Sequence, residues 1–141
     1  MAIDLGVVVV AYNQPRWLEF LFASIRRDSH VEPQFMLFLH SNDPETNDAC
    51  RKQVKHKDTI LRHYPSQTRS LAKSWNEGLI ELHDIGLNRV LIMNDDMAFQ
   101  EPSGVGVLAQ DAIDHQENFA VFATGSIGYP ETKVESHNFG C

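Results

Sequence analysis

Short runs of apolar residues alternate along the chain with longer stretches in which apolar residues recur every three or four positions. The runs have the length of strands and fall at residues 5–10, 35–39, 59–61, 89–93 and 119–123. The first run is almost entirely valine, a pattern typical of a parallel strand buried on both faces. The stretches between the runs predict helices that cover the sheet.

The first helical stretch follows a polar turn. Asn13 is placed to cap this helix, and Pro15 falls in its first turn, where a proline is well tolerated. Its apolar residues recur at helical spacing: Trp17, Leu18, Leu21, Phe22 and Ile25. A second, more polar helix is expected over about 47–57.

A third helix is expected between Ser70, as its cap, and Gly86, as its stop. Its apolar stripe consists of Leu71, Trp75, Leu79 and Leu82. A further helix opens at 102–103. The stretch 125–141 has no clear period, and we interpret it as a loop or the start of another element.

Strands that alternate with helices predict parallel βαβ units with right-handed crossovers. We therefore expect an α/β fold, a three-layer sandwich whose central sheet is mostly parallel. The 141 residues are enough for one domain with a core and too few for two. We expect a single domain over 1–141, with a ligand cleft beyond the carboxyl ends of the strands.

Composition narrows the class of ligand and the compartment. The net charge is −7 and the Lys and Arg residues are scattered, which argues against nucleic acid as a partner. Cys50 and Cys141 have no ligand-like spacing, so a disulfide framework is not expected. The amino terminus does not resemble a signal peptide, and no run approaches the roughly 20 apolar residues that span a bilayer. We expect a cytoplasmic protein without a transmembrane segment.

The acidic cluster Asn94-Asp95-Asp96 follows directly after the strand at 89–93. Two adjacent carboxylates repel each other, and a divalent cation would relieve that repulsion while bridging to phosphate oxygens. The other interpretation is a polar turn whose Asp side chains cap the next segment. The cluster alone leaves both open.

Three segments, taken in order, resemble motifs of the large inverting glycosyltransferase family 2. Residues 7–15, VVVVAYNQP, are similar to that family's opening strand and loop. Residues 71–78, LAKSWNEG, look like its A-x-N-x-G helix, and residues 91–97, LIMNDDM, are similar to its variant of the DxD motif. The resemblance implies a GT-A fold, which is related to the Rossmann fold. It also implies hexosyl transfer from a UDP- or GDP-sugar to an acceptor hydroxyl, with Mn²⁺ or Mg²⁺ as cofactor.

The same resemblance implies roles for matching residues. Those expected to contact the nucleotide or its phosphates are Ala11, Tyr12, Asn13, His40, Ser41, Arg69, Lys73, Asn94 and Asp95. Asp96, with Asp95, would hold the metal ion, and His137 is a candidate for an extra ligand. The alternatives stay open: Tyr12 as an ordinary strand-end side chain, and Arg69 and Lys73 as solvated charges.

Two departures from the family pattern matter. The family usually has an Asp after its second strand to bind the base, whereas this turn reads His40-Ser41-Asn42-Asp43. Its catalytic base lies well downstream, so we expect this chain to stop before the acceptor-binding half, with Glu131 and Glu135 as the candidates for a base. The alternative is a non-catalytic nucleotide-sugar-binding module or partner subunit. The expected partners are a glycan, lipid or protein acceptor and either a second copy of the chain (a homodimer) or a completing partner domain.

One apparent motif is excluded by its context. Residues 104–109 match the G-x-G-x-x-A dinucleotide fingerprint. That fingerprint must follow directly after a buried strand, and residues 99–103 predict a turn.

Overall fold

The computed structural model describes residues 2–64, 69–115, 120–124 and 135–139, with the last two segments described by their backbone alone. Elements follow in chain order: β1 (Ile3–Ala11), α1 (Pro15–Arg26), β2 (Val31–Leu39), α2 (Pro44–Val54), β3 (Thr59–His63), α3 (Leu71–Asp84), β4 (Val90–Asn94), α4 (Gly104–Asp114), β5 (Ala120–Thr124) and β6 (Glu135–Phe139). The predicted alternation of strands and helices is confirmed.

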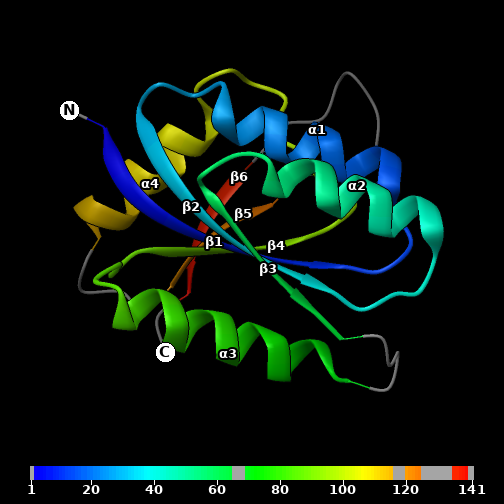
Figure 1. The fold of residues 1–141 in the computed structure, drawn as a ribbon. Helices are drawn as coiled ribbons and strands as arrows, with labels where there is room; N and C mark the ends of the chain where they lie inside the picture. Colours follow the sequence, from blue (N-terminus) through cyan, green and yellow to red (C-terminus); the bar gives the residue numbers. More distant parts are fainter. Residues whose placement is uncertain (1, 65–68, 116–119, 125–134, 140–141) are drawn as a thin grey trace.

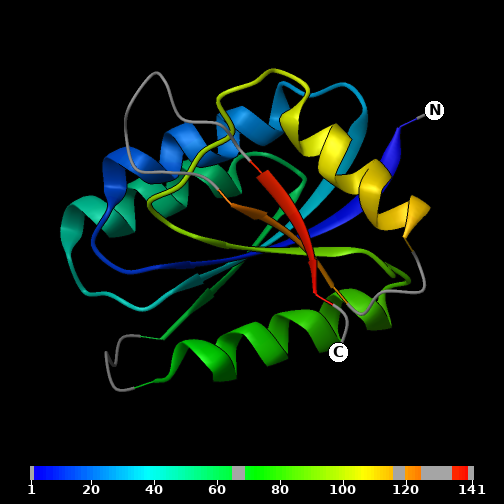
Figure 2. The same ribbon diagram turned by 180° about the vertical axis from the view of Figure 1, so that it is seen from behind.

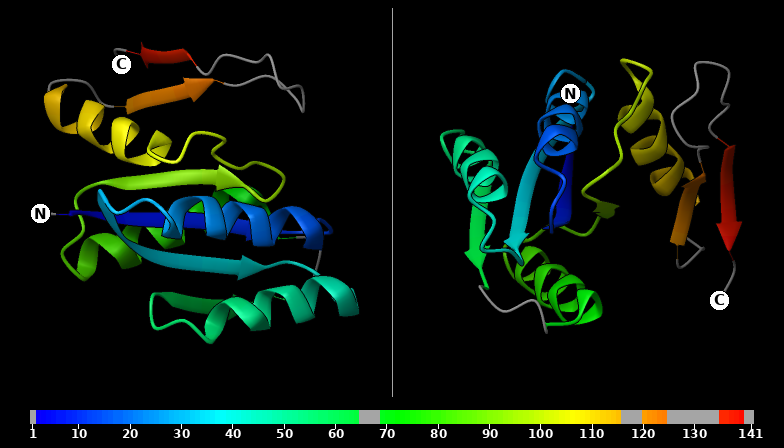
Figure 3. Two further views of the ribbon diagram at one scale, coloured as in Figure 1. Left: turned by 90° about the horizontal axis from the view of Figure 1, so that it is seen from above. Right: turned by 90° about the vertical axis from the view of Figure 1, so that its right-hand side faces the viewer.

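The central sheet has four parallel strands in the order β3-β2-β1-β4, so β1 is paired on both sides. β5 and β6 form a separate antiparallel pair that lies beyond α4 (Figure 3). The stretch 125–141, expected to be a loop or the start of another element, thus contains the short strand β6.

Helices cover the two faces of the sheet unequally. Figure 1 shows α1, α2 and α4 on one face and α3 on the other, and Figure 2 shows the same layers from behind. The crossovers through α1 and α2 carry the chain from β1 to β3 in one direction. α3 then returns it past β1 to β4, so a right-handed crossover places α3 on the opposite face. The three-layer α/β sandwich predicted from the sequence is confirmed.

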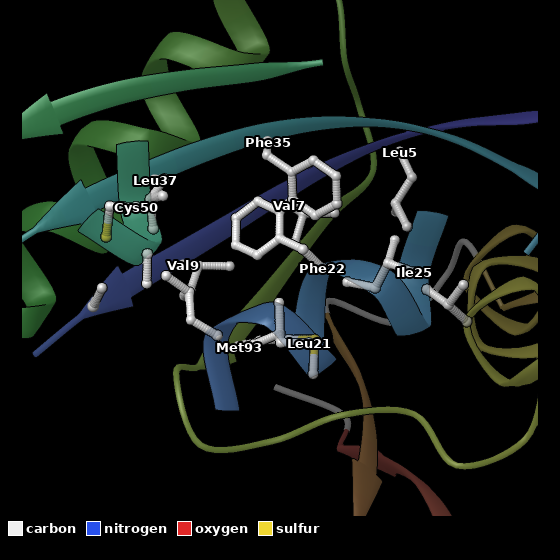
Figure 4. Close-up of a cluster of buried hydrophobic side chains, with 14 of the residues drawn as sticks. Leu5, Val7, Val9, Leu21, Phe22, Ile25, Phe35, Leu37, Cys50 and Met93 are labelled. Carbon is white, nitrogen blue, oxygen red and sulfur yellow. The ribbon is translucent and has the colours of Figure 1, made fainter. Parts of the chain in front are cut away.

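The larger core lies under α1, α2 and α4. Odd-numbered residues of β1 and β2 face it, including Val7, Val9, Phe35 and Leu37, which lie against the α1 side chains Leu21, Phe22 and Ile25 (Figure 4). Even-numbered residues face α3 in a smaller cluster built on Val8, Val10, Met36, Phe38 and Leu82. Burial on both faces explains why β1 lacks the alternation of a half-exposed strand.

The first two helices are present as predicted, but the cap of α1 and the start of α2 differ from the prediction. Gln14, not Asn13, is the N-cap of α1, and Pro15 opens the helix as expected. Trp17, expected on the sheet, is 44% exposed. α2 starts three residues earlier than predicted because the Asp43 carboxylate accepts a hydrogen bond from the backbone N–H of Thr46.

α3 packs on the sheet through small residues rather than through the whole predicted stripe. Ser70 caps it and Gly86 follows it with a φ of +96°, as expected. Its buried residues, however, are Ser74, Gly78 and Leu82, whereas Leu71 is exposed and Leu79 is half-buried. A Cβ atom at Gly78 would lie 2.8 Å from Cγ2 of Val8, so only glycine allows this close approach to β1.

The end of α1 fastens the segment that follows β4. The backbone N–H of Phe99 donates to Ser24 Oγ (3.1 Å), and Arg27 donates to the carbonyl oxygens of Phe99 (2.7 Å) and Gln100 (2.8 Å). The segment between β4 and α4 is therefore fixed at its middle by α1.

Candidate functional site

The order of the strands creates one special position in the sheet. From β1 the chain moves outward through β2 to β3, and it then returns to place β4 on the other side of β1. At such a switch point the loops after the two neighbouring strands lead in opposite directions, and ligands of open α/β sheets bind at that carboxyl edge. The loops in question begin at Tyr12 and at Asp95.

A hydrogen bond joins these two loops. The backbone N–H of Tyr12 donates to Oδ2 of Asp95 at 2.8 Å, across 83 residues of sequence. Val10 and Asn94 are the last paired residues of β1 and β4, so the bond lies just beyond the end of the strand pair. The sequence motif after β1 and the acidic cluster after β4 therefore form one structural unit.

The two carboxylates of the cluster differ in environment. Asp96 and Asn94 are exposed, whereas Asp95 is half-buried. Burial raises the pKa of the Asp95 carboxyl; the hydrogen bond from Tyr12 opposes this rise and the neighbouring Asp96 carboxylate adds to it. Neither side chain caps α4, whose N-cap is Ser103. The capping interpretation of the cluster is thus wrong for that helix.

These carboxylates suit a divalent cation shared with a phosphate ligand. Within the described side chains, no group of three or more His, Cys, Asp or Glu lies close enough to form an all-protein cage. Mg²⁺ commonly uses one or two carboxylates plus substrate phosphate oxygens, and Mn²⁺ also takes oxygen ligands. Asp96 and the second oxygen of Asp95, Oδ1, match that donor set.

Three helices begin at the same edge of the sheet. α1, α2 and α3 each follow the carboxyl end of a strand, at Pro15, Pro44 and Leu71. A helix amino terminus carries a partial positive charge and N–H groups that favour anions. Asp43 and Ser70 already accept one N–H each at α2 and α3, whereas α1 has no side-chain cap. Lys73 adds an exposed charge in the first turn of α3. The local positive charge at this edge therefore favours a diphosphate, although the net charge of the chain is −7.

Asn13 and Ser41 meet between the first two strand ends. Ser41 Oγ donates to Oδ1 of Asn13 at 3.0 Å and accepts from the backbone N–H of Asp43 at 3.0 Å. The Asn13 side chain is exposed, while Ser41 is fully buried. Because Asn13 accepts through its oxygen, its amide NH₂ is oriented to donate elsewhere. Asp43 meanwhile accepts from Thr46, so the one carboxylate of this turn serves as a helix cap.

His40 lies beneath the edge rather than on it. Its side chain is 0% exposed, and Nε2 lies 2.7 Å from Oγ of Ser74 on α3. Burial, with a smaller effect of the Arg69 charge, lowers the pKa of His40 below its ordinary value. The imidazole is therefore neutral near pH 7.

Arg69 lies with α3 and not beside the acidic cluster. Its guanidinium donates to Ser74 Oγ (2.9 Å) and to the Glu77 carboxylate, and it stacks 3.8 Å above the ring centre of Tyr64. Tyr64 in turn donates its hydroxyl to Glu77 at 2.7 Å. Sequence reasoning missed Tyr64, Ser74 and Glu77, although Tyr64 follows β3 directly, as Tyr12 follows β1.

The remaining candidates belong to the last part of the chain. Glu131 lies outside the described residues. Glu135 and His137 belong to β6, for which only the backbone is described; His137 pairs there with Phe122. Their roles as base or metal ligand stay predictions.

None of the helices in the described ranges is long and apolar enough to cross a membrane.

Comparison with known proteins gives no match by sequence and clear matches by structure. No family model matches the chain, and no curated protein matches it. The mannosyltransferase PcManGT from Pyrobaculum calidifontis, in complex with GDP-Man and Mn²⁺, aligns with a TM-score of 0.65 at 16% identity, covering 82% of this chain and 34% of that one.

Two structures of S. aureus TarS are also similar. The first, of residues 1–349, aligns with a TM-score of 0.63 at 14% identity over 81% of this chain and 33% of that one. The second gives 0.64 at 13% identity over 92% and 23%. The chain thus spans about a third or less of each of these proteins. What it shares with them is the architecture: this chain has a glycosyltransferase-like fold.

Proposed function

We propose that the chain binds a nucleoside-diphosphate sugar at the carboxyl edge between β1 and β4, through a divalent metal ion held by Asp96 and Asp95. One observation carries the proposal: the Tyr12–Asp95 hydrogen bond, which brings the acidic cluster next to Ala11, Tyr12 and Asn13. A nucleoside against Tyr12 would then have its diphosphate near both carboxylates and the helix amino termini.

The comparisons support the choice of ligand class. A similar structure holds GDP-Man and Mn²⁺, and the three motifs described above resemble those of glycosyltransferase family 2. When bound, the ion would neutralise charge on the leaving diphosphate. The residues of the chain would orient the donor: Tyr12 by stacking, Asn13 by donating its amide, and Lys73 by its charge.

The reaction we propose is transfer of the sugar to an acceptor hydroxyl. Such a reaction needs a general base on the acceptor, and Glu131 and Glu135 are the first residues to mutate. A non-catalytic donor-binding module is the second candidate, and the transfer assay below distinguishes the two.

Calorimetry with UDP and GDP, each in Mn²⁺ and in EDTA, tests the binding proposal. We expect at least one nucleotide to bind more tightly with metal. Equal affinity in EDTA would refute the metal site, and no binding of either nucleotide would refute the function. Incubation with UDP- and GDP-sugars and a panel of acceptors, followed by mass spectrometry, then separates transfer from binding alone.

A further inference from the structure

Three rings form a row along the carboxyl edge, on the face of the sheet that α3 covers. Ala11 pairs with Leu39, and Leu39 pairs with His63, so the next residues in register are Tyr12, His40 and Tyr64. Backbone hydrogen bonds from His40 to Ala11 (2.9 Å) and from Tyr64 to Leu39 (2.8 Å) extend the sheet to this row. The middle ring, His40, forms a T-shaped pair with each neighbour, with centroids 5.6 Å from Tyr12 and 6.0 Å from Tyr64.

The middle ring is held from below by α3. Nε2 of His40 lies 2.7 Å from Ser74 Oγ, and that oxygen accepts a hydrogen bond from Nε of Arg69 at 2.9 Å. Both His40 and Ser74 are 0% exposed. A ring in this position cannot itself contact a ligand, but it can fix the ring that does.

The two tyrosines depend on His40 to different degrees. Tyr64 is anchored by its hydroxyl to Glu77 and is covered by the Arg69 guanidinium. The Tyr12 hydroxyl has no hydrogen-bond partner among the described residues, and the bond from Tyr12 to Asp95 is made by its backbone N–H. The orientation of the Tyr12 ring therefore rests on packing, and His40 is the ring in edge contact with it.

We propose that His40 is a positioning residue: held by Ser74, it fixes the Tyr12 ring in the orientation in which that ring stacks on the nucleoside. This inference rests on the proposed function for its ligand. A ring already fixed loses less conformational freedom when the base binds, so the nucleoside part of the ligand binds more tightly. The diphosphate part gains nothing from His40, because its partners are the metal ion and the helix amino termini.

Two substitutions separate the ring of His40 from its hydrogen bond. His40→Gln keeps a polar group for Ser74 but removes the ring, and His40→Phe keeps a ring but removes the hydrogen bond. Ser74→Ala, which removes only a hydroxyl, loosens His40 with little change of volume and serves if the His40 variants do not fold. Each is compared with Tyr12→Ala alone and in combination.

The ligand readout compares nucleoside diphosphate with inorganic pyrophosphate, both in Mn²⁺, by calorimetry. We expect His40→Gln to weaken binding of UDP or GDP about two- to tenfold, the scale of immobilising one side chain, and to leave pyrophosphate unchanged. His40→Phe should lose less than His40→Gln. In the Tyr12→Ala background His40→Gln should have no further effect. Equal losses for both ligands, or an effect that persists without Tyr12, would overturn the proposal.

A second readout needs no ligand. The chain has 3 tyrosines, so ¹³C-labelled rings can be assigned by single Tyr→Phe variants and their order measured by NMR relaxation. We expect His40→Gln and Ser74→Ala to lower the order of the Tyr12 ring and to leave Tyr64 unchanged. An equally ordered Tyr12 ring overturns the positioning role. If the variants disorder the Tyr12 ring but the wild type binds no nucleotide, His40 still positions Tyr12 and the proposed function is refuted.

Discussion

Asp28, two residues past the end of α1, accepts a hydrogen bond from the backbone N–H of Gly106 in the first turn of α4 at 2.7 Å. The cap residue of α4, Ser103, makes no side-chain cap of its own. Asp28 therefore caps a helix that lies 78 residues away in the sequence. Together with Ser24 and Arg27, it ties the chain after the acidic cluster to α1.

We expect Asp28→Ala to lower the free energy of unfolding by about 1–3 kcal/mol, because it leaves the buried N–H of Gly106 without an acceptor and also removes the bond from His30. Burial alone would raise the pKa of Asp28, but hydrogen bonds from His30 and Gly106 hold it below its ordinary value of 3.8. The stabilisation is thus present above pH 3.8 and is lost as the pH falls through the lower folded-state pKa. Urea unfolding at pH 7 and at pH 3 measures both effects. A cost that does not shrink in acid would contradict the ionised cap.

Removing the metal ligand should remove the dependence on metal. We expect Asp96→Ala to bind UDP or GDP equally in Mn²⁺ and in EDTA, because the ion loses an exposed carboxylate. Asp84→Ala is the matched control, since Asp84 is also exposed but ends α3 at the other edge of the sheet. Calorimetry compares the two variants. If Asp96→Ala keeps its response to Mn²⁺, the ion is held elsewhere.

Tyr12 should matter more for binding than for folding. We expect Tyr12→Ala to weaken nucleotide binding by about 1–3 kcal/mol, the scale of stacking on single-stranded bases, and Tyr12→Phe to stay near the wild type. Stability should change less, because the ring is only half-buried. Thermal melts and calorimetry on the same samples decide the point. A variant that unfolds while its folded fraction keeps full affinity would make Tyr12 structural.

His40 should make stability fall on mild acidification. Burial first, and then the Arg69 charge, lower its pKa below the ordinary 6.5, so the unfolded chain takes up a proton more readily than the folded one. Stability is therefore highest above pH 6.5 and falls as the pH drops below that value toward the folded-state pKa. We expect His40→Gln to lose less stability than the wild type between pH 7.5 and about pH 5.5 in urea titrations. Parallel curves for the two proteins would show that His40 does not titrate in this way.

Gly78 should tolerate no side chain. A Cβ atom there would lie 2.8 Å and 2.9 Å from the two Cγ atoms of Val8. We expect Gly78→Ala to cost about 1–3 kcal/mol, the usual range for overpacking a core, despite the higher helix propensity of alanine. Asn76→Ala, on the exposed side of the same helix, is the control. A Gly78→Ala protein as stable as that control would mean that α3 can move away from β1.

The sequence predicted those parts of the site that local pattern determines. Parallel strands share their carboxyl edge, so motifs that follow β1 and β4 directly had to lie at one end of the sheet. The buried face of α3 could not be predicted in the same way. Ser74 and Gly78 carry no hydrophobic signal, and they are buried because the close approach to β1 leaves room for little else.

Pairings over long separations were also beyond local reasoning. Asn13 suits a helix cap and equally suits a bond to Ser41, and only the packed sheet chooses the latter. Arg69 was expected to face the acidic cluster or the phosphates, and its contacts with Ser74 and Glu77 could not be read from local pattern. The sequence placed His40 in a turn, but it did not predict that His40 is buried against the Tyr12 ring.

The separation between Tyr12 and Asp95 also leads us to expect a particular order of assembly. β1 can pair with β2 after one crossover, whereas the Tyr12–Asp95 bond closes a loop of 83 residues. Contacts between residues far apart in sequence cost more loop-closure entropy, so we expect this bond to form late in folding. Local opening of β4 would take the site apart while β1, β2 and β3 stay paired. The amide hydrogen of Tyr12, whose acceptor is the Asp95 carboxylate, thus reports through its exchange with solvent how often the two halves of the site come apart.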